Sequence, residues 1–170
     1  GGAVGALAWS PDGRWLAVAA RPGKPPAPKL DDWRVTGWKP GQNQDVTIIT
    51  KLQYKANGRG LLDDRHQKIH LVEAATGRSV QVTFGDCDDA NPVWSPDGSW
   101  IGFTSSRRPD RDIHPRSDLY AVAVNQIVRN HGPGTPGALG ESELPPVRLS
   151  CGHPGSLGSV SWSPDGHWLL

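Results

Sequence analysis

The sequence predicts an all-β chain, an incomplete β-propeller arc of about three to four blades, each built of four antiparallel strands. The pentapeptide Trp-Ser-Pro-Asp-Gly occurs three times, at residues 9–13, 94–98 and 162–166. On its flanks apolar residues recur with a period of two, which is typical of strands. The first two copies lie 85 residues apart, about twice the ~40 to 45 residues of a propeller blade. Together these observations predict repeated β-hairpins.

The repeated pentapeptide has the chemistry of a hairpin turn. Proline sets the φ angle that a type I turn needs, aspartate suits the next position, and glycine adopts the left-handed conformation that follows. A three-residue loop would place Trp9 opposite Trp15, and the same spacing pairs Trp94 with Trp100 and Trp162 with Trp168. The residues expected to build these structural turns, including a degenerate fourth copy, are Trp9, Pro11, Asp12, Gly13, Asn57, Gly58, Trp94, Pro96, Asp97, Gly98, Trp162, Pro164, Asp165 and Gly166.

The spacing divides residues 1–170 into repeat units of one partial propeller domain. Hairpins are expected near residues 9–15, 54–60, 94–100 and 162–168, so that the chain stops inside the fourth repeat. The second unit is predicted to contain the strands "TIITKLQY", "GLLDD", "KIHLVEA" and "SVQVTF". The third is predicted to contain "NPVWS", "WIGFTSS", "DLYAVAV" and "PVRLS". A Gly/Pro-rich insertion lengthens the last step.

Composition argues against several classes of partner. The 18 Lys and Arg residues against 17 Asp and Glu give a net charge of +1, so no nucleic-acid footprint is expected. No apolar run approaches the ~20 residues that span a bilayer, and we expect no membrane partner. Two cysteines are too few for a disulfide framework, which favours a cytoplasmic location.

We expect no metal, no cofactor and no catalytic residue in this chain. His66 and His70 are four residues apart, but in a strand that separation is roughly 13 Å, too far for one ion. No serine lies in the Gly-x-Ser-x-Gly turn of a hydrolase nucleophile. The repeat aspartates are one residue out of register with a sialidase Asp-box. The acidic pairs 63–64 and 88–89 leave a propeller glycosidase open as an alternative.

The string "YKANGRGLLDDRHQKIHLVEAATGRSVQVTFGDCDDANPVWSPDGSWIGFTSSR" together with the repeats resembles the N-terminal propeller of the prolyl oligopeptidase family. The similarity is greatest to its acylaminoacyl-peptidase and dipeptidyl-aminopeptidase branch. It implies a C-terminal α/β-hydrolase domain with a Ser, Asp, His triad, which this chain lacks, and a propeller that limits which peptides enter. Cys87 departs from the pattern, where an aromatic residue is expected. TolB-type propellers also use the pentapeptide, and an interaction scaffold of that type is the alternative.

The loops between strands two and three and between strands four and one should share one face of the propeller. Charged residues concentrate in these loops, whereas the hairpin face carries mainly turn residues. Charged loops are common on any surface, so a solvated rim is the competing interpretation. We expect this face to meet the hydrolase domain and the peptide substrate, with arginines binding peptide carboxylates. The candidate gating residues are Arg107, Arg108, Arg111, Asp63, Asp64 and Arg65.

Overall fold

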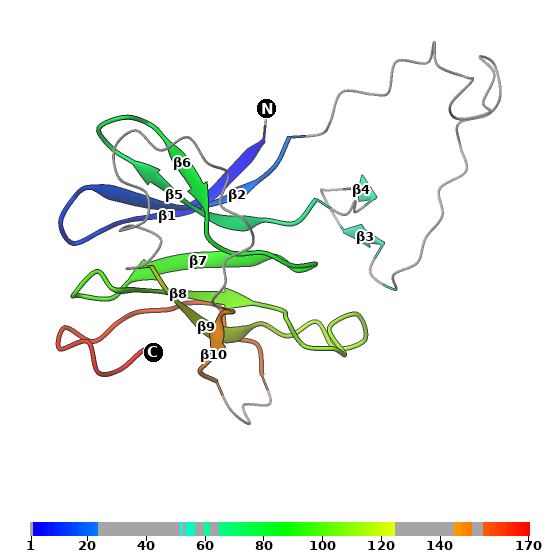
Figure 1. The fold of residues 1–170 in the computed structure, drawn as a ribbon. Helices are drawn as coiled ribbons and strands as arrows, with labels where there is room; N and C mark the ends of the chain where they lie inside the picture. Colours follow the sequence, from blue (N-terminus) through cyan, green and yellow to red (C-terminus); the bar gives the residue numbers. More distant parts are fainter. Residues whose placement is uncertain are drawn as a thin grey trace, which may run out of the picture.

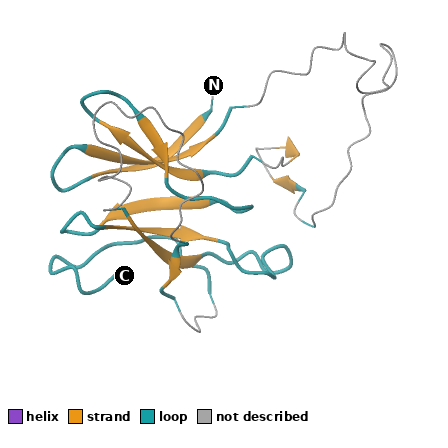
Figure 2. Ribbon diagram, viewed as in Figure 1, coloured by secondary structure: helices purple, strands orange, loops and turns teal. Residues whose placement is uncertain are grey.

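The computed structural model describes residues 2–23, 52, 54–56, 60–61, 65–124, 145–150 and 155–170, and these contain ten strands and no helix (Figures 1 and 2). The strands are β1 (Ala3–Trp9), β2 (Trp15–Arg21), β3 (Lys55–Ala56), β4 (Gly60–Leu61), β5 (Lys68–Glu73), β6 (Ser79–Gln81), β7 (Asp89–Trp94), β8 (Trp100–Ser105), β9 (Asp118–Ala123) and β10 (Val147–Arg148). Within the described ranges no helix is long and apolar enough to cross a membrane.

Two four-stranded antiparallel sheets form the body of the molecule. Their strand orders are β1-β2-β5-β6 and β10-β9-β8-β7, so sequential strands pair throughout the second sheet, and in the first sheet β2 pairs with β5. Figure 1 shows the two sheets stacked face to face, one above the other. A four-stranded meander that packs its face on the next meander is a propeller blade. The prediction of an all-β propeller arc is confirmed.

The composition of the first blade differs from the predicted one. Strands β5 and β6, expected in a second unit whose hairpin lies near residues 54–60, complete the first sheet instead, because β5 pairs with β2 along its whole length. Strands β3 and β4 form a separate two-stranded sheet, while Asn57 and Gly58 lie outside the described residues. The 85-residue step therefore holds one blade with an insertion between its second and third strands. The strands predicted for the third unit form the second sheet.

Each pentapeptide forms a hairpin tip held together by side chains. In the first tip the Ser10 hydroxyl donates to Asp12 Oδ1 at 2.6 Å and accepts from the Trp15 backbone N–H at 2.9 Å. The Gly13 N–H donates to the Ser10 carbonyl, and glycines 13, 98 and 166 have φ angles of 69°, 70° and 73°. The left-handed conformation predicted for these glycines is confirmed.

The predicted tryptophan pairs across the tips are wrong by one residue. Trp9 pairs with Leu16, and Ser10 exchanges hydrogen bonds with Trp15. Trp94 pairs with Ile101 and Trp162 with Leu169 in the same way. In the predicted three-residue loop, a backbone carbonyl would accept the hydrogen bond from the N–H after the turn. Here the Ser10 hydroxyl accepts the Trp15 N–H instead, and the loop contains four residues. The two tryptophans of a repeat therefore face opposite sides of their sheet.

The core lies between the two sheets. The first sheet contributes small and aliphatic side chains, among them Ala17, Ile69 and Leu71, and the second contributes the larger Phe103 and Tyr120. Their rings stack with centroids 6.0 Å apart. Successive side chains of a strand point to opposite faces of its sheet, so every second residue of these strands faces this core. The interface between blades is therefore the hydrophobic core of the molecule.

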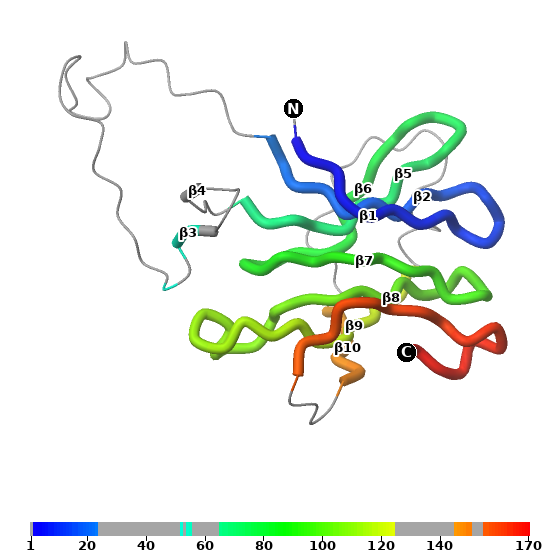
Figure 3. Tube along the Cα trace, turned by 180° about the vertical axis from the view of Figure 1, so that it is seen from behind, coloured from blue at the N-terminus to red at the C-terminus, as the bar shows by residue number. Residues whose placement is uncertain are grey.

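A third hairpin covers the other side of the second sheet. Ser161 and Leu170 exchange two backbone hydrogen bonds, and Trp162 bridges to Leu169. Figure 3 shows this C-terminal segment running along β8. A β-carbon at Gly102 of β8 would lie 2.9 Å from Leu169 Cδ2, so the Leu169 side chain occupies the space that a β-carbon would take. The described arc thus has two complete blades and the first hairpin of a third.

Candidate functional site

Charged side chains gather at the end of the sheets opposite the hairpin tips. We call this the charged end and define it as residues 65–68, 82–89 and 106–117. Antiparallel connections place the β6–β7 loop, the β8–β9 loop and the segment entering β5 at this end (Figure 1). Ion pairs join the segment entering β5 and the β8–β9 loop to the β6–β7 loop between them. These loops were predicted to lie on one face, and the strand order places them there.

Asp89 is the buried centre of the charged end. Its side chain is 0% exposed, and its carboxylate lies 3.2 Å from Lys68 Nζ and 2.8 Å from Arg107 Nη2. Lys68 Nζ also donates to the Cys87 carbonyl. An isolated buried carboxylate would be strongly unfavourable, and the two cations beside it offset part of that cost. Asp89 therefore ties the start of β5 and the β8–β9 loop to β7.

Arg107 is held by more than its ion pair. Its Nη1 donates to the Phe84 carbonyl at 3.0 Å. Its guanidinium carbon lies 5.7 Å from the centroid of the Phe103 ring and 5.8 Å from that of Tyr120. These distances allow a cation–π attraction on the aromatic side chains of the core. The guanidinium is thus fixed within the protein, which makes its first role structural.

A second, more exposed network surrounds His66. Its Nε2 lies 2.6 Å from Asp86 Oδ1, and its Nδ1 lies 3.3 Å from Asp88 Oδ1. Arg21 Nη2 donates to Asp88 at 2.7 Å, and Arg111 Nη2 donates to Asp86 at 3.1 Å. Solvent reaches both aspartates, so each pair contributes little stability by itself. The network nevertheless aligns two arginines and a histidine along one rim.

The structure separates the candidate gating residues by their surroundings. Arg107 is fixed on Asp89, whereas Arg108 and Arg111 are partly exposed and pair with exposed aspartates. The Arg65 Nη1 donates to the Pro22 carbonyl at 3.3 Å. Asp63 and Asp64 lie outside the described residues. A gating role for these residues stays a prediction.

Sequence reasoning missed Arg21 and Lys68. Arg21 is the last residue of β2, and its Nη1 donates to the Arg65 carbonyl at 2.6 Å. Lys68 is the first residue of β5 and is buried. Both are basic residues at the end of an apolar strand, where that strand meets the charged loops. This pattern could have identified them in the sequence. The pairing partners could not be read from the sequence because they follow from the strand order.

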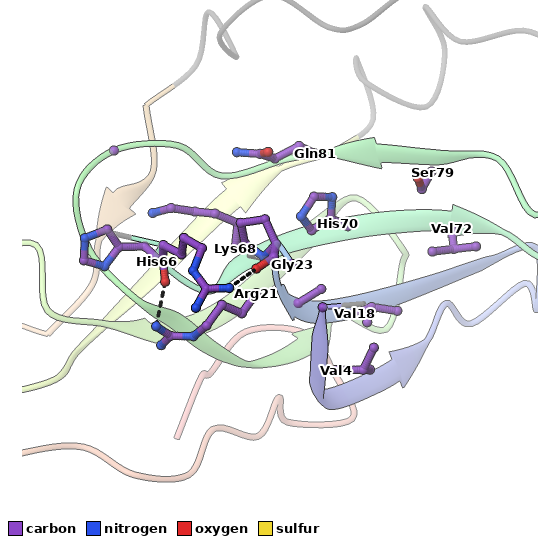
Figure 4. Close-up of a pocket in the computed structure, with 15 residues that line it drawn as sticks. Val4, Val18, Arg21, Gly23, His66, Lys68, His70, Val72, Ser79 and Gln81 are labelled. Carbon is purple, nitrogen blue, oxygen red and sulfur yellow. Dashed lines mark hydrogen bonds between the residues drawn. The ribbon is translucent and has the colours of Figure 1, made fainter. Parts of the chain in front are cut away.

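A cavity of about 620 Å³ extends from the charged end along the outer face of the first sheet (Figure 4). Arg21, His66 and Lys68 line its polar end, and Val18 and Val72 line its apolar part. His70 lies between them, and its burial lowers the pKa of the imidazole below the ordinary value of 6.5. The cause is desolvation, which disfavours the charged form of the imidazole.

The repeat aspartates form local bonds within their turns. Asp97 accepts hydrogen bonds from the Ser95 and Ser99 hydroxyls and from the Ser99 N–H, which lower its pKa from 3.8 to about 2. Hydrogen bonds from Ser10 and Ser163 also lower the pKa values of Asp12 and Asp165.

The acidic pair Asp88 and Asp89 does not offer two accessible carboxylates, because Asp89 is fully buried. Among the described residues, no three His, Cys, Asp or Glu side chains are grouped as a metal site would need.

Comparisons with known proteins found similarity in sequence to a repeat model and to a protein described as a peptidase. The model of the WD domain, G-beta repeat, matches residues 1–23 and 145–170. A protein of Bacillus subtilis (strain 168), described as uncharacterized peptidase YuxL, is 27% identical over 114 residues, which are 67% of this chain and 17% of that protein.

Among solved structures, the crystal structure of the tricorn protease aligns with 92% of this chain and 14% of that chain, at 12% identity and a TM-score of 0.47. The chain thus spans less than a fifth of the length of either protein. Over two thirds of its own length, it is similar in sequence to a protein described as a peptidase, and residues at both ends match the WD repeat.

Proposed function

We propose that this chain is the non-catalytic propeller portion of a serine peptidase of the prolyl oligopeptidase family, in its acylaminoacyl-peptidase or dipeptidyl-aminopeptidase branch. The observation that carries the proposal is the 27% identity over 114 residues to a protein described as a peptidase. The chain spans 17% of that protein, which leaves ample length for a catalytic domain. The proposed partner is a C-terminal α/β-hydrolase domain of the same polypeptide, and the proposed role is to select the peptides that reach it.

The charged end supplies groups suited to peptide selection. Arg108 and Arg111 hold their guanidinium groups at the rim through exposed aspartates rather than through buried ones. A peptide carboxylate can replace such an aspartate, because an exposed ion pair has little net stability to lose. A guanidinium binds a carboxylate through charge-assisted hydrogen bonds, which are stronger than neutral ones. The two arginines would therefore favour peptides that bring a free carboxylate to this rim.

Arg107 would act differently in this scheme. Its guanidinium is occupied by Asp89 and the Phe84 carbonyl, and it packs on the rings of the core. It would position the β8–β9 loop that carries Arg108 and Arg111 instead of meeting the peptide. Removing it would disturb the fold together with the rim, so it is unsuitable for a binding test.

The test uses the polypeptide in which this chain is joined to its hydrolase domain. The variant Arg108→Ala/Arg111→Ala should raise KM for peptides with a free carboxylate about tenfold, the loss expected for one charged hydrogen bond. KM for a small uncharged ester should change little. The matched control is Arg14→Ala/Arg78→Ala, which removes two arginines from the hairpin face. Equal effects of the two double variants on peptide KM would contradict the proposal.

An interaction scaffold of the TolB type is the second candidate. The match of the WD repeat model to residues 1–23 and 145–170 favours it, since the model covers repeat hairpins and no catalytic motif. The two candidates differ in what the gene encodes beyond the propeller. A Gly-x-Ser-x-Gly motif with Asp and His downstream supports the peptidase, and a gene without them supports the scaffold.

A further inference from the structure

His66 lies between two carboxylates of the β6–β7 loop. Its Nε2 is 2.6 Å from Asp86 Oδ1, and its Nδ1 is 3.3 Å from Asp88 Oδ1. An ionised carboxylate only accepts hydrogen bonds, so each of these contacts needs an N–H on the ring. Neutral imidazole has one N–H, whereas imidazolium has two. Both contacts are therefore satisfied together only when His66 is protonated.

The two aspartates each hold an arginine with their other carboxylate oxygen. Asp86 Oδ2 accepts from Arg111 Nη2 at 3.1 Å. Asp88 Oδ2 accepts from Arg21 Nη2 at 2.7 Å. The carboxylates and the guanidinium groups of these pairs cancel in charge. Protonation of His66 therefore gives this network a net positive charge, and that charge lies beside Asp86.

Other charged and titratable groups lie near His66. Arg65 precedes it in the chain, and Lys68 is buried and pairs with Asp89. His70 lines the same cavity, and burial lowers the pKa of its imidazole below 6.5. Histidine is the residue type that ordinarily changes charge between about pH 5 and 8. His66 is therefore the titratable group that connects the two exposed carboxylates.

Peptide binding at the rim would separate Arg111 from Asp86, because in the proposed function a peptide carboxylate replaces this aspartate. A protonated His66 offsets part of that loss, since its Nε2–H still donates to Asp86 Oδ1. A neutral ring supplies no positive charge beside Asp86, so the same separation costs more free energy. The charge on His66 therefore decides how readily Arg111 exchanges one carboxylate for another.

We propose that His66 is a pH-dependent positioning residue for Arg111. Protonation of His66 lets Arg111 leave Asp86 and bind the carboxylate of a peptide, and deprotonation holds Arg111 on Asp86. The inference rests on the proposed function and makes its peptide selection depend on pH. Selection of peptides with a free carboxylate is strongest at the acidic end of the range in which histidine titrates, about pH 5 to 8, and weakens toward the alkaline end.

The test uses the polypeptide in which this chain is joined to its hydrolase domain. Two peptides serve as substrates, and they differ only in ending with a free carboxylate or with a carboxamide. The KM of the carboxamide divided by that of the free acid measures carboxylate selection, and titration of groups in the hydrolase domain affects both values alike. This KM ratio should fall about threefold between about pH 5.5 and 8, the effect of one partly exposed charge.

Two substitutions fix the charge beside the aspartates. His66→Lys remains positive over this pH range, so the KM ratio should stay high at both pH values. His66→Gln is neutral, so the ratio should stay low at both. His114→Gln is the matched control, because His114 is an exposed histidine of the β8–β9 loop, and it should keep the pH dependence of the unsubstituted protein. Circular dichroism checks that each variant folds.

Three results would overturn this inference. The KM ratio of the unsubstituted protein could be independent of pH, both His66 variants could keep its pH dependence, or His114→Gln could abolish it. In Arg108→Ala/Arg111→Ala the two peptides should have similar KM values at every pH. A KM ratio that stays high in this double variant would contradict the proposed function, and the inference with it. A ratio that is lost there but does not respond to the His66 variants would contradict the inference alone.

Discussion

Arg107 Nη2 donates to both carboxylate oxygens of Asp89, at 2.9 Å to Oδ1 and 2.8 Å to Oδ2. The carboxylate is fully buried, and Lys68 Nζ approaches it from the first sheet at 3.2 Å. One buried anion thus joins the first sheet, β7 and the β8–β9 loop. The relationship explains why Arg107, the arginine nearest the core, is a structural group, whereas Arg108 and Arg111 form ion pairs with exposed aspartates.

Replacing this anion should be the most damaging single change at the charged end. Asp89→Asn leaves Lys68 and Arg107 buried without their counter-charge, and losing one partner of a buried pair costs about 3–5 kcal/mol. The free energy of unfolding, measured by urea denaturation, should fall by that amount. Asp110→Asn, which breaks an exposed pair with Arg108, is the control and should change stability little. Similar losses in the two variants would show that Asp89 is not a buried link.

The tip glycines should resist substitution because of their backbone and not because of crowding. Gly98 has a φ of 70°, and a β-carbon there would make only an ordinary contact with Pro11. Gly98→Ala should therefore destabilise the protein by about 1–2 kcal/mol, the cost of the left-handed conformation for a residue with a β-carbon. Gly98→Asn should be better tolerated.

The matched control for this substitution is Gly158→Ala. No described atom lies within 4 Å of a β-carbon at Gly158, and its φ lies outside the left-handed region. Thermal denaturation should show little change for it. A loss as large as that of Gly98→Ala would mean that removing any loop glycine destabilises the chain and that the turn conformation is not the cause.

The tip aspartates should make the protein sensitive to acid. Hydrogen bonds from Ser95 and Ser99 lower the pKa of Asp97 from 3.8 to about 2. Because the folded pKa lies below the unfolded one, this stabilisation is complete above about pH 4 and is lost as the pH falls toward 2. Ser95→Ala should raise the pKa of Asp97 in a carboxyl NMR titration. Ser106→Ala, whose hydroxyl bonds to the Arg116 carbonyl, should leave it unchanged.

Gly102 should control attachment of the third hairpin. A β-carbon there would lie 2.9 Å from Leu169 Cδ2 and 3.3 Å from Trp162 Nε1. Gly102→Val should push the hairpin away from β8 and speed amide hydrogen exchange in residues 161–170, while exchange in β1 and β2 stays the same. Unchanged protection of the hairpin would mean that it repacks easily on the larger side chain.

The sequence predicted which charged residues lie at the candidate site, but it did not predict which of them form ion pairs with one another. Charged loops at one end follow from antiparallel strands, and Arg107, Arg108 and Arg111 were identifiable as charged loop residues. Their different surroundings depend on Asp89, which lies 18 residues earlier in the chain. Lys68 and Arg21 escaped because each belongs to an apolar strand whose partner strands were assigned to the wrong blade.

The local structure of the repeats follows from the amino-acid sequence alone. Each tip is closed by bonds within six residues, as between Ser10 and Trp15, so its turn and its left-handed glycine follow from the pentapeptide. Even there the exact register depended on a serine hydroxyl that accepts a backbone N–H.

Which strands share a blade depends on packing between segments that lie far apart in the sequence. Strand β2 pairs with β5 across an insertion of about 46 residues, because Val18 and His70 pair between the two strands while Ala17 and Leu71 bury their side chains against the second sheet. Loop closure adds little free energy for each further residue, so a long insertion does not prevent that pairing. Repeat spacing counts residues along the chain and cannot distinguish such an insertion from a blade. The burial of apolar surface between sheets makes that distinction, and it is a property of the folded chain.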